Sequence, residues 1–162
     1  MLDLFIKNGI VVTPQGLIRG GVGIQSGRIA LITADELPSQ EVVDARGQYV
    51  LPGVIDPHIH MGIGATHGQG EAIFESDFQT ESVSAAVGGV TTILTSATFG
   101  RSAEPMVSRM KRARAIAQQS SIVDFKIFPF FVTKSHVEEI PQLMKEGFTN
   151  FVTRASKELD LR

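Results

Sequence analysis

From Leu51 onward, short runs of apolar and β-branched residues alternate with segments of helical pattern, and this alternation limits the possible folds more than any other feature of the sequence. Repeated strand–helix alternation produces a parallel sheet whose crossovers are right-handed. The sequence therefore predicts an α/β fold after residue 50. The strands are expected at residues 54–60, 90–94 and 125–132, and from residue 148 onward.

Capping residues, glycines and apolar spacing predict the first two helices. Ser76 and Gln79 fit a capping box for a helix that should end at Gly88-Gly89. A second helix is expected over residues 103–119, with Pro105 in its first turn. Its apolar residues repeat at helical spacing and should form one buried face: Met106, Met110, Ala113 and Ala117.

A third helical segment should follow the strand at 125–132. Ser135 and Glu138 fit a capping box, Pro141 indicates a break or a second start, and Gly147 should end the segment. Residues 51–162 thus have room for three βα units and the start of a fourth, at roughly 30 residues per unit. A closed barrel needs about 250 residues. The expectation is a partial (β/α)8 TIM-type barrel of three to four βα units.

Residues 1–50 predict a separate, small all-β module. Short apolar runs in this part are divided by turn signals at Asn8-Gly9, Pro14–Gly16 and Ser26-Gly27. Asn8-Gly9 is interpreted as a turn between two strands, and Ser26-Gly27 as a hairpin. The domain division expected from the sequence is therefore 1–50 and 51–162.

Composition and charge exclude several classes of function. The 162 residues are 43% hydrophobic and carry a formal charge of −2, which argues against a nucleic-acid binder. The absence of cysteine excludes disulfides, thiolate catalysis and cysteine-bound metal. No apolar run reaches the roughly 20 residues of a membrane span, and the first residues do not resemble a secretory signal. A cytoplasmic location is the expectation.

Two histidines stand two positions apart in the run Gly53–His60. Alternate side chains of a strand point to the same side, so His58 and His60 can reach one metal ion together. The alternative is an ordinary pair of surface or core histidines. A catalytic zinc site usually has three protein ligands, so two histidines do not complete one.

This run, placed after a small β module, resembles the amidohydrolase superfamily and, more narrowly, the cyclic amidohydrolases: hydantoinase, dihydropyrimidinase, allantoinase and dihydroorotase. The resemblance continues through several other short segments. They are Gly27–Ile32, Asp44–Gly47, Asp77-Phe78, Gly88–Thr92 and Phe148–Phe151. The resemblance thus covers nearly the whole chain, and it corresponds to the amino-terminal part of such an enzyme.

The resemblance implies a β-sandwich segment over 1–50, an incomplete metal-dependent hydrolase barrel over 51–162, and hydrolysis of a small cyclic amide such as a dihydropyrimidine or hydantoin. It implies that His58 and His60 bind one of two divalent ions, zinc being expected, and that the full-length family forms homo-oligomers. A carboxylated lysine bridges the two ions in the family, and further histidines and an aspartate come from later strands.

Two positions depart from the family pattern. Met61-Gly62 replaces the Leu-Arg pair of dihydroorotase-type sequences, which disfavours dihydroorotate as the substrate. Val152 occupies the position of the carboxylated lysine, and Lys157 is not interpreted as its substitute. No catalytic residue is therefore expected within this chain, and a truncated or frameshifted non-catalytic product, or an interaction fragment, is the alternative to an enzyme. A third hypothesis is a half-barrel completed by another chain.

Other polar residues have simpler interpretations. Asp56 is interpreted as supporting the strand end or as orienting a histidine without contacting the metal, with a catalytic role as the alternative. His67 is interpreted as a solvated loop residue, with a place in a substrate loop as the alternative, and His136 as an exposed residue beside a helix start. The basic cluster of Arg109, Lys111, Arg112 and Arg114 is interpreted as the solvated outer face of a barrel helix, with a nucleic-acid-binding surface as the alternative. Gly20-Gly21 and Gly88-Gly89 lack phosphate-loop spacing and are assigned to turns and helix ends.

Overall fold

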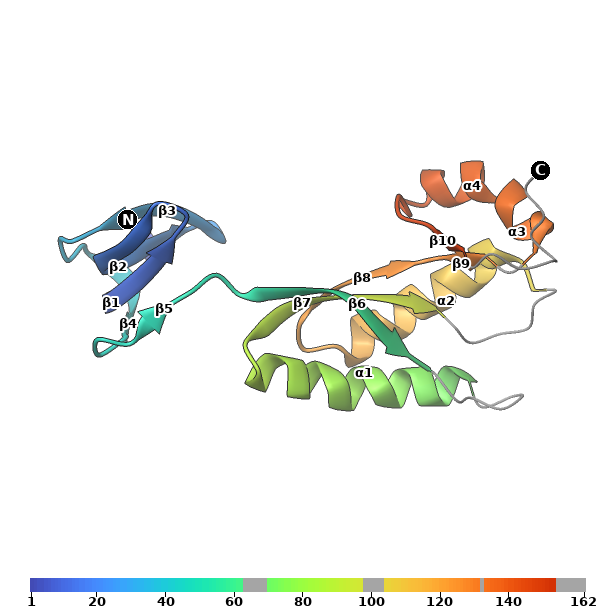
Figure 1. Ribbon diagram of the computed structural model, residues 1–162, viewed down its shortest axis with the longest axis horizontal. Helices are drawn as coiled ribbons and strands as arrows, with labels where there is room; N and C mark the ends of the chain where they lie inside the picture. The colour runs from blue at the N-terminus through green and yellow to red at the C-terminus, as the bar shows by residue number, and fades with distance from the viewer. Residues whose placement is uncertain (63–69, 98–103, 132, 154–162) are drawn as a thin grey trace. The chain divides into compact units, whose positions relative to one another are not determined.

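The computed structural model describes residues 1–62, 70–97, 104–131 and 133–153. The chain divides into two compact units, Met1–Pro52 and Gly53–Arg162 (Figure 1). The first unit contains strands only, and the second contains parallel strands joined by helices. This mixed α/β organisation agrees with the alternation predicted after Leu51. No helix among the described residues is both long and apolar enough to cross a membrane.

The first unit is a single five-stranded sheet. Its strands lie in the order β3-β2-β1-β4. The short strand β5 lies on the same side of β1 as β4, but it pairs with a later part of β1, at Ile10 and Val11. Strands β1, β2 and β3 are antiparallel neighbours, whereas β4 and β5 run parallel to β1. The strands are β1 (Leu2–Thr13), β2 (Gly16–Gln25), β3 (Arg28–Thr33), β4 (Ser39–Asp44) and β5 (Tyr49–Val50). Residues 1–52 therefore supply one layer, and not two sheets packed face to face.

The hairpin predicted at Ser26-Gly27 is confirmed, whereas the turn predicted at Asn8-Gly9 is wrong. Ser26 and Gly27 both have positive φ, which is the two-residue turn that suits a twisted hairpin. Asn8 also has positive φ, but it lies inside the continuous strand β1, where the pairing with β2 shifts register between Ile6 and Gly9. Asparagine tolerates this conformation, so Asn8 forms a β-bulge and the strand continues.

Gly20 and Gly21 do not form a turn either, which corrects the sequence prediction. Both lie within β2, and they are needed for close packing. A Cβ at Gly20 would lie 2.2 Å from the carbonyl oxygen of Thr33, and one at Gly21 would lie 2.4 Å from Cζ of Phe5. The absence of a side chain at these positions lets β3 and the Phe5 ring approach β2 directly.

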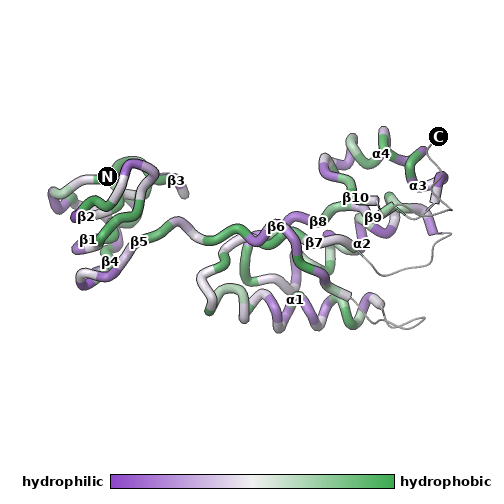
Figure 2. The backbone as a smooth tube through the Cα atoms, viewed as in Figure 1, coloured by the Kyte–Doolittle hydropathy of each residue, from purple (hydrophilic) through white to green (hydrophobic). Residues whose placement is uncertain are grey.

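The second unit contains the parallel sheet β6-β7-β8 and a separate parallel pair, β9 and β10. Its strands are β6 (Val54–Met61), β7 (Val90–Ala97), β8 (Asp124–Phe128), β9 (Phe130–Phe131) and β10 (Val152–Thr153). Its helices are α1 (Gly70–Val87), α2 (Met106–Ser120), α3 (Lys134–Glu138) and α4 (Ile140–Lys145). Figure 2 shows hydrophilic and hydrophobic residues interspersed along α1, as expected of a helix with one buried side.

The core of this unit lies between the helices and one face of the sheet. Phe74 and Phe78 of α1 are fully buried one turn apart, with their rings 5.0 Å apart. The stripe predicted on α2 is confirmed, because Met106, Met110, Ala113 and Ala117 are all fully buried. The strands contribute the other half of this core with Met61, Ile93, Ala97, Ile127 and Phe131. The helices therefore cover one face of the sheet.

Several predicted boundaries move for physical reasons. Helix α1 begins at Gly70, six residues before the predicted cap at Ser76, because burial of Phe74 extends the helix toward its amino terminus. The end at Gly88-Gly89 is confirmed by the positive φ of Gly89. Thr133, and not Ser135, caps α3, since its side chain accepts a hydrogen bond from the backbone N–H of His136.

The break predicted at Pro141 is confirmed, because Pro141 lies in the first turn of the separate helix α4. The positive φ of Gly147 marks the end of this segment, as predicted. The third strand is interrupted at Pro129. The fourth begins only at Val152, later than the predicted start at Phe148.

Candidate metal centre

His58 and His60 lie close together at the carboxyl end of β6. Their Nε2 atoms are 3.0 Å apart, and their rings meet edge to face with centroids separated by 4.8 Å. Both side chains are exposed, so an ion can reach them. The strand ends at Met61, whose side chain is fully buried against the helices and fixes that end of the strand.

A local irregularity of β6 separates the two histidines from Asp56. Asp56 pairs with Ile93 and Ile59 pairs with Thr95, so three steps on β6 match two steps on β7. Because paired residues of a parallel sheet share a face, Asp56 lies on the face of the buried Ile93, toward the helices. Simple alternation would have placed it beside the histidines.

The side chain of Asp56 instead supports the backbone at the bulge. Its Oδ1 atom accepts a hydrogen bond of 3.1 Å from the backbone N–H of His58. A carboxylate in this position holds the chain two residues further on, as an Asx turn does. The contact fits a supporting role behind the histidine pair.

The two imidazoles fit part of a metal site. Nitrogens that each lie about 2.05 Å from a tetrahedral zinc ion are separated by roughly 3.3 Å, close to the observed Nε2–Nε2 distance. Within residues 1–62, 70–97, 104–131 and 133–153, however, no group of three or more histidine, cysteine, aspartate or glutamate side chains could hold a metal ion. The described part of the chain therefore offers a two-nitrogen corner of a site.

Val152, like the histidine pair, lies on the side of its strand that faces away from the helix-side core. Val152 pairs with Phe130, and Phe130 stands next to Phe131, which is buried in the helix-side core. Alternation therefore places Phe130 and Val152 on the side away from that core. His60 points away from the core too, because its neighbour Met61 is part of it. The residue at the expected lysine position is thus an aliphatic side chain that, like the histidine pair, faces away from the helices.

His136 is buried and not exposed, which corrects the sequence prediction. Its side chain is 1% exposed, and its Nε2 atom lies 3.0 Å from the carbonyl oxygen of Glu104. The residue anchors α3 to the segment that leads into α2. No sequence signal pointed to this, because a polar residue beside a helix start usually faces solvent. His67 and Lys157 lie outside the described residues.

The basic cluster on α2 is held by carboxylates, but it is not entirely a solvated face. Arg109 is only 4% exposed and lies 3.9 Å from Glu104, which makes the prediction of an outward side chain wrong at this position. Burial lowers the pKa of Arg109, and the Glu104 carboxylate opposes that shift. The other members contact acids or an aromatic ring: Lys111 with Glu146, Arg112 with Glu71 and Glu104, and Arg114 with Phe148.

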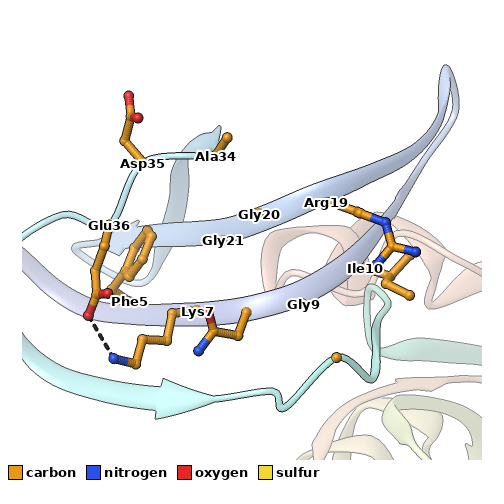
Figure 3. A pocket seen from close by; sticks show the side chains of 12 residues that line it. Phe5, Lys7, Gly9, Ile10, Arg19, Gly20, Gly21, Ala34, Asp35 and Glu36 are labelled. Carbon is orange, nitrogen blue, oxygen red and sulfur yellow. Dashed lines mark hydrogen bonds and ion pairs between the residues drawn. The ribbon is translucent and has the colours of Figure 1, made fainter.

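Each unit has an open hollow among its described residues. One, of about 440 Å³, lies between β6 and α1 and is lined by Asp56, His60, Asp77 and Glu81 among others. Asp77 is not free there, because its carboxylate accepts a hydrogen bond of 2.7 Å from the backbone N–H of Gly62. The other, of about 310 Å³, lies on the sheet of the first unit, where Lys7 pairs with Glu36 at 2.7 Å (Figure 3).

Comparison with known proteins identifies this arrangement. The chain is 34% identical to a D-hydantoinase of Geobacillus stearothermophilus over 151 residues, which are 90% of this chain and 31% of that protein. It superimposes on a D-hydantoinase structure with a TM-score of 0.78 and 29% identity, covering 99% of this chain and 35% of the other. A dihydropyrimidinase structure from Brevibacillus agri gives a TM-score of 0.76 at 28% identity, covering 98% of this chain and 34% of that one.

The chain belongs to the cyclic amidohydrolases. No protein-family model matches it. The chain spans about a third of the length of the curated relatives that it matches. Within this cyclic amidohydrolase chain, the parallel strands and the histidine pair lie in the second unit, and the first unit is the strand-only module.

Proposed function

We propose that this chain forms part of a metal-dependent hydrolase of small cyclic amides, of the hydantoin or dihydropyrimidine type. The observation that carries the proposal is the 3.0 Å approach of Nε2 of His58 to Nε2 of His60 at the carboxyl end of β6. In α/β barrels the reacting groups come from the carboxyl ends of the strands. The parallel strands of residues 54–153 are accordingly interpreted as the first part of a (β/α)8 barrel.

His58 and His60 would hold a divalent ion, with zinc as the expected metal. Their donor atoms are the neutral imidazole nitrogens that zinc accepts, and the observed spacing suits two ligands of one ion. Asp56 holds the backbone N–H of His58 and so keeps the first ligand in place. A divalent ion bound here would supply hydroxide at neutral pH and polarise the amide carbonyl of the ring.

A non-catalytic role is the second candidate, and Val152 is the observation that favours it. An aliphatic side chain cannot bridge two metal ions, and Val152, like the histidine pair, lies on the face away from the helix-side core. A chain that binds one ion weakly and opens no ring would fit an interaction fragment. Completion of the site by another chain is a third hypothesis, in which the partner adds donors to the same face.

Metal titration of the purified chain tests the proposed site. Co²⁺ is a suitable probe, because its visible absorption reports the ligand set. We expect saturable binding of one equivalent, reduced at least tenfold by His58→Ala and by His60→Ala. Asp124→Asn is the matched control, since Asp124 is an exposed residue at the amino end of β8, the opposite end of the parallel strands.

The same preparations separate the two candidate functions. Ring opening of hydantoin or dihydrouracil by the metal-loaded chain, lost in both histidine variants, would support the hydrolase. Metal binding without ring opening would favour the non-catalytic role. Equal Co²⁺ binding by the wild-type chain and both histidine variants would refute the metal site itself.

A further inference from the structure

A row of three residues crosses the sheet at the level of the histidine pair. His60 of β6 pairs with Ser96 of β7, and Ser96 pairs with Phe128 of β8. Paired residues of parallel strands share a face, and neighbouring strands are about 4.8 Å apart. The side chain of Ser96 therefore lies beside that of His60, on the face opposite the helices.

Ser96 carries a buried hydroxyl that lacks a partner. The residue is 1% exposed, and its Oγ atom has no hydrogen bond within the described part of the chain. A buried hydroxyl without a partner is costly, so most such groups in proteins are paired. Serine can also turn its hydroxyl between staggered positions about one bond. The expected partner of the Ser96 hydroxyl is a hydrogen-bond donor or acceptor that lies within reach on the face of the sheet opposite the helices.

His60 offers such a group. Its Nε2 atom faces Nε2 of His58, which leaves Nδ1 as the second nitrogen of the ring. Nδ1 is bonded to Cγ and is therefore closer to the backbone of β6 than Nε2 is. A histidine that binds metal through one nitrogen usually donates the N–H of the other to a fixed acceptor, and this bond sets the tautomer.

We propose that Ser96 is a positioning residue for His60, whose Nδ1–H donates a hydrogen bond to Oγ of Ser96. The contact fixes His60 as the Nδ1–H tautomer and leaves the lone pair of its Nε2 free. In the metal-free chain, Nε2–H of His58 then donates to Nε2 of His60 across the 3.0 Å gap. A metal ion held by both Nε2 atoms would require the Nδ1–H tautomer of His58 as well, whereas His60 would already have the tautomer that the ion needs.

The tautomers can be measured without metal. Long-range ¹H–¹⁵N correlation spectra distinguish the Nδ1–H tautomer of a neutral imidazole from its Nε2–H tautomer. We expect His60 as Nδ1–H and His58 as Nε2–H in the wild-type chain. Ser96→Ala should convert His60 to a mixture, and Ser96→Thr should restore the wild-type pattern, since it keeps the hydroxyl. The reverse assignment in the wild-type chain would overturn the inference, even if Ser96→Ala failed to fold.

A Co²⁺ titration adds a second readout, and this part rests on the proposed metal site. Loss of a supporting hydrogen bond to a metal-binding histidine typically weakens metal affinity by about 10- to 100-fold. Ser96→Ala should show that loss and Ser96→Thr should not. Thr92→Val is the matched control, because Thr92 stands on the same face of β7, four residues before Ser96, and loses a hydroxyl too.

The outcomes distinguish the two proposals. If the wild-type chain binds no Co²⁺ but shows the expected tautomers, the metal site fails and the Ser96 contact stands. If Co²⁺ binds equally well to the wild-type chain and to Ser96→Ala, the role of Ser96 fails and the histidine site stands. An equal loss in Thr92→Val and Ser96→Ala would indicate general weakening of β7 and would also overturn the inference.

Discussion

At the residue scale, the histidine pair depends on a detail of strand β6 that simple alternation omits. Two-residue spacing correctly brings His58 and His60 together, because it follows from strand geometry alone. The same spacing would put Asp56 beside them. The register shift between Asp56 and Ile59 moves this carboxylate to the helix side, where it holds the backbone N–H of His58. The position of a bulge depends on how β6 pairs with β7, and the sequence of β6 alone does not determine that pairing.

Asp56 therefore predicts a measurable effect on the pair. Asp56→Ala removes the acceptor for the N–H of His58, and one such hydrogen bond contributes about 1 kcal/mol to stability. We expect a loss of this size in urea unfolding and a roughly tenfold weaker Co²⁺ affinity. Asp56→Asn keeps an Oδ1 acceptor and should stay close to the wild type. A fully retained Co²⁺ affinity in Asp56→Ala would show that the bulge does not need this contact.

At the element scale, strong local patterns predicted the helices and strands, whereas tertiary contacts set their limits. Local sequence was enough to predict the apolar stripe Met106–Ala117, the end of α1 at Gly88-Gly89 and the new helix start at Pro141. It was not enough to predict the start of α1, because burial of Phe74 extends the helix toward its amino terminus, past the apparent cap at Ser76. Burial of His136 likewise depends on Glu104, 32 positions away in the chain.

Helix α2 shows a cap that comes from a distant element. Pro105 precedes the helix and provides no capping side chain, but the carboxylate of Glu139 accepts hydrogen bonds of 2.9 Å from the backbone N–H groups of Met106 and Val107. These groups have no partner within the helix, and a carboxylate also complements the helix dipole. Glu139 thus ties α2 to the segment between α3 and α4.

Replacing Glu139 should destabilise the second unit. Glu139→Ala leaves two first-turn N–H groups without an acceptor, and losing a cap costs about 0.5–2 kcal/mol. Urea unfolding followed by circular dichroism measures the difference. Glu138→Ala is the control, because the neighbouring Glu138 is exposed and makes no such contact. Equal effects of the two substitutions would mean that the cap does not stabilise α2.

At the scale of the whole molecule, the chain assembles its candidate site from separate strands. β6 provides the histidines, β7 provides Ser96, and β10 provides Val152, although about 90 residues separate His60 from Val152 in the chain. The family resemblance indicated which position should carry the bridging lysine. The pairing of Val152 with Phe130 and the burial of Phe131 place Val152 on the side away from the helices, which sequence spacing alone does not determine.

Val152→Lys should therefore strengthen metal binding. Its side chain would extend away from the helices, as those of His58 and His60 do, and a lysine in contact with carbon dioxide can form a carbamate whose oxygens suit a divalent ion. In bicarbonate buffer we expect a tighter Co²⁺ complex, by tenfold or more, and an intact mass increased by one carbon dioxide. Val152→Leu controls for the larger side chain, since it extends the same position without a nitrogen. Unchanged affinity in a folded Val152→Lys chain would show that β10 and β6 do not converge on one ion, and would count against the partial barrel.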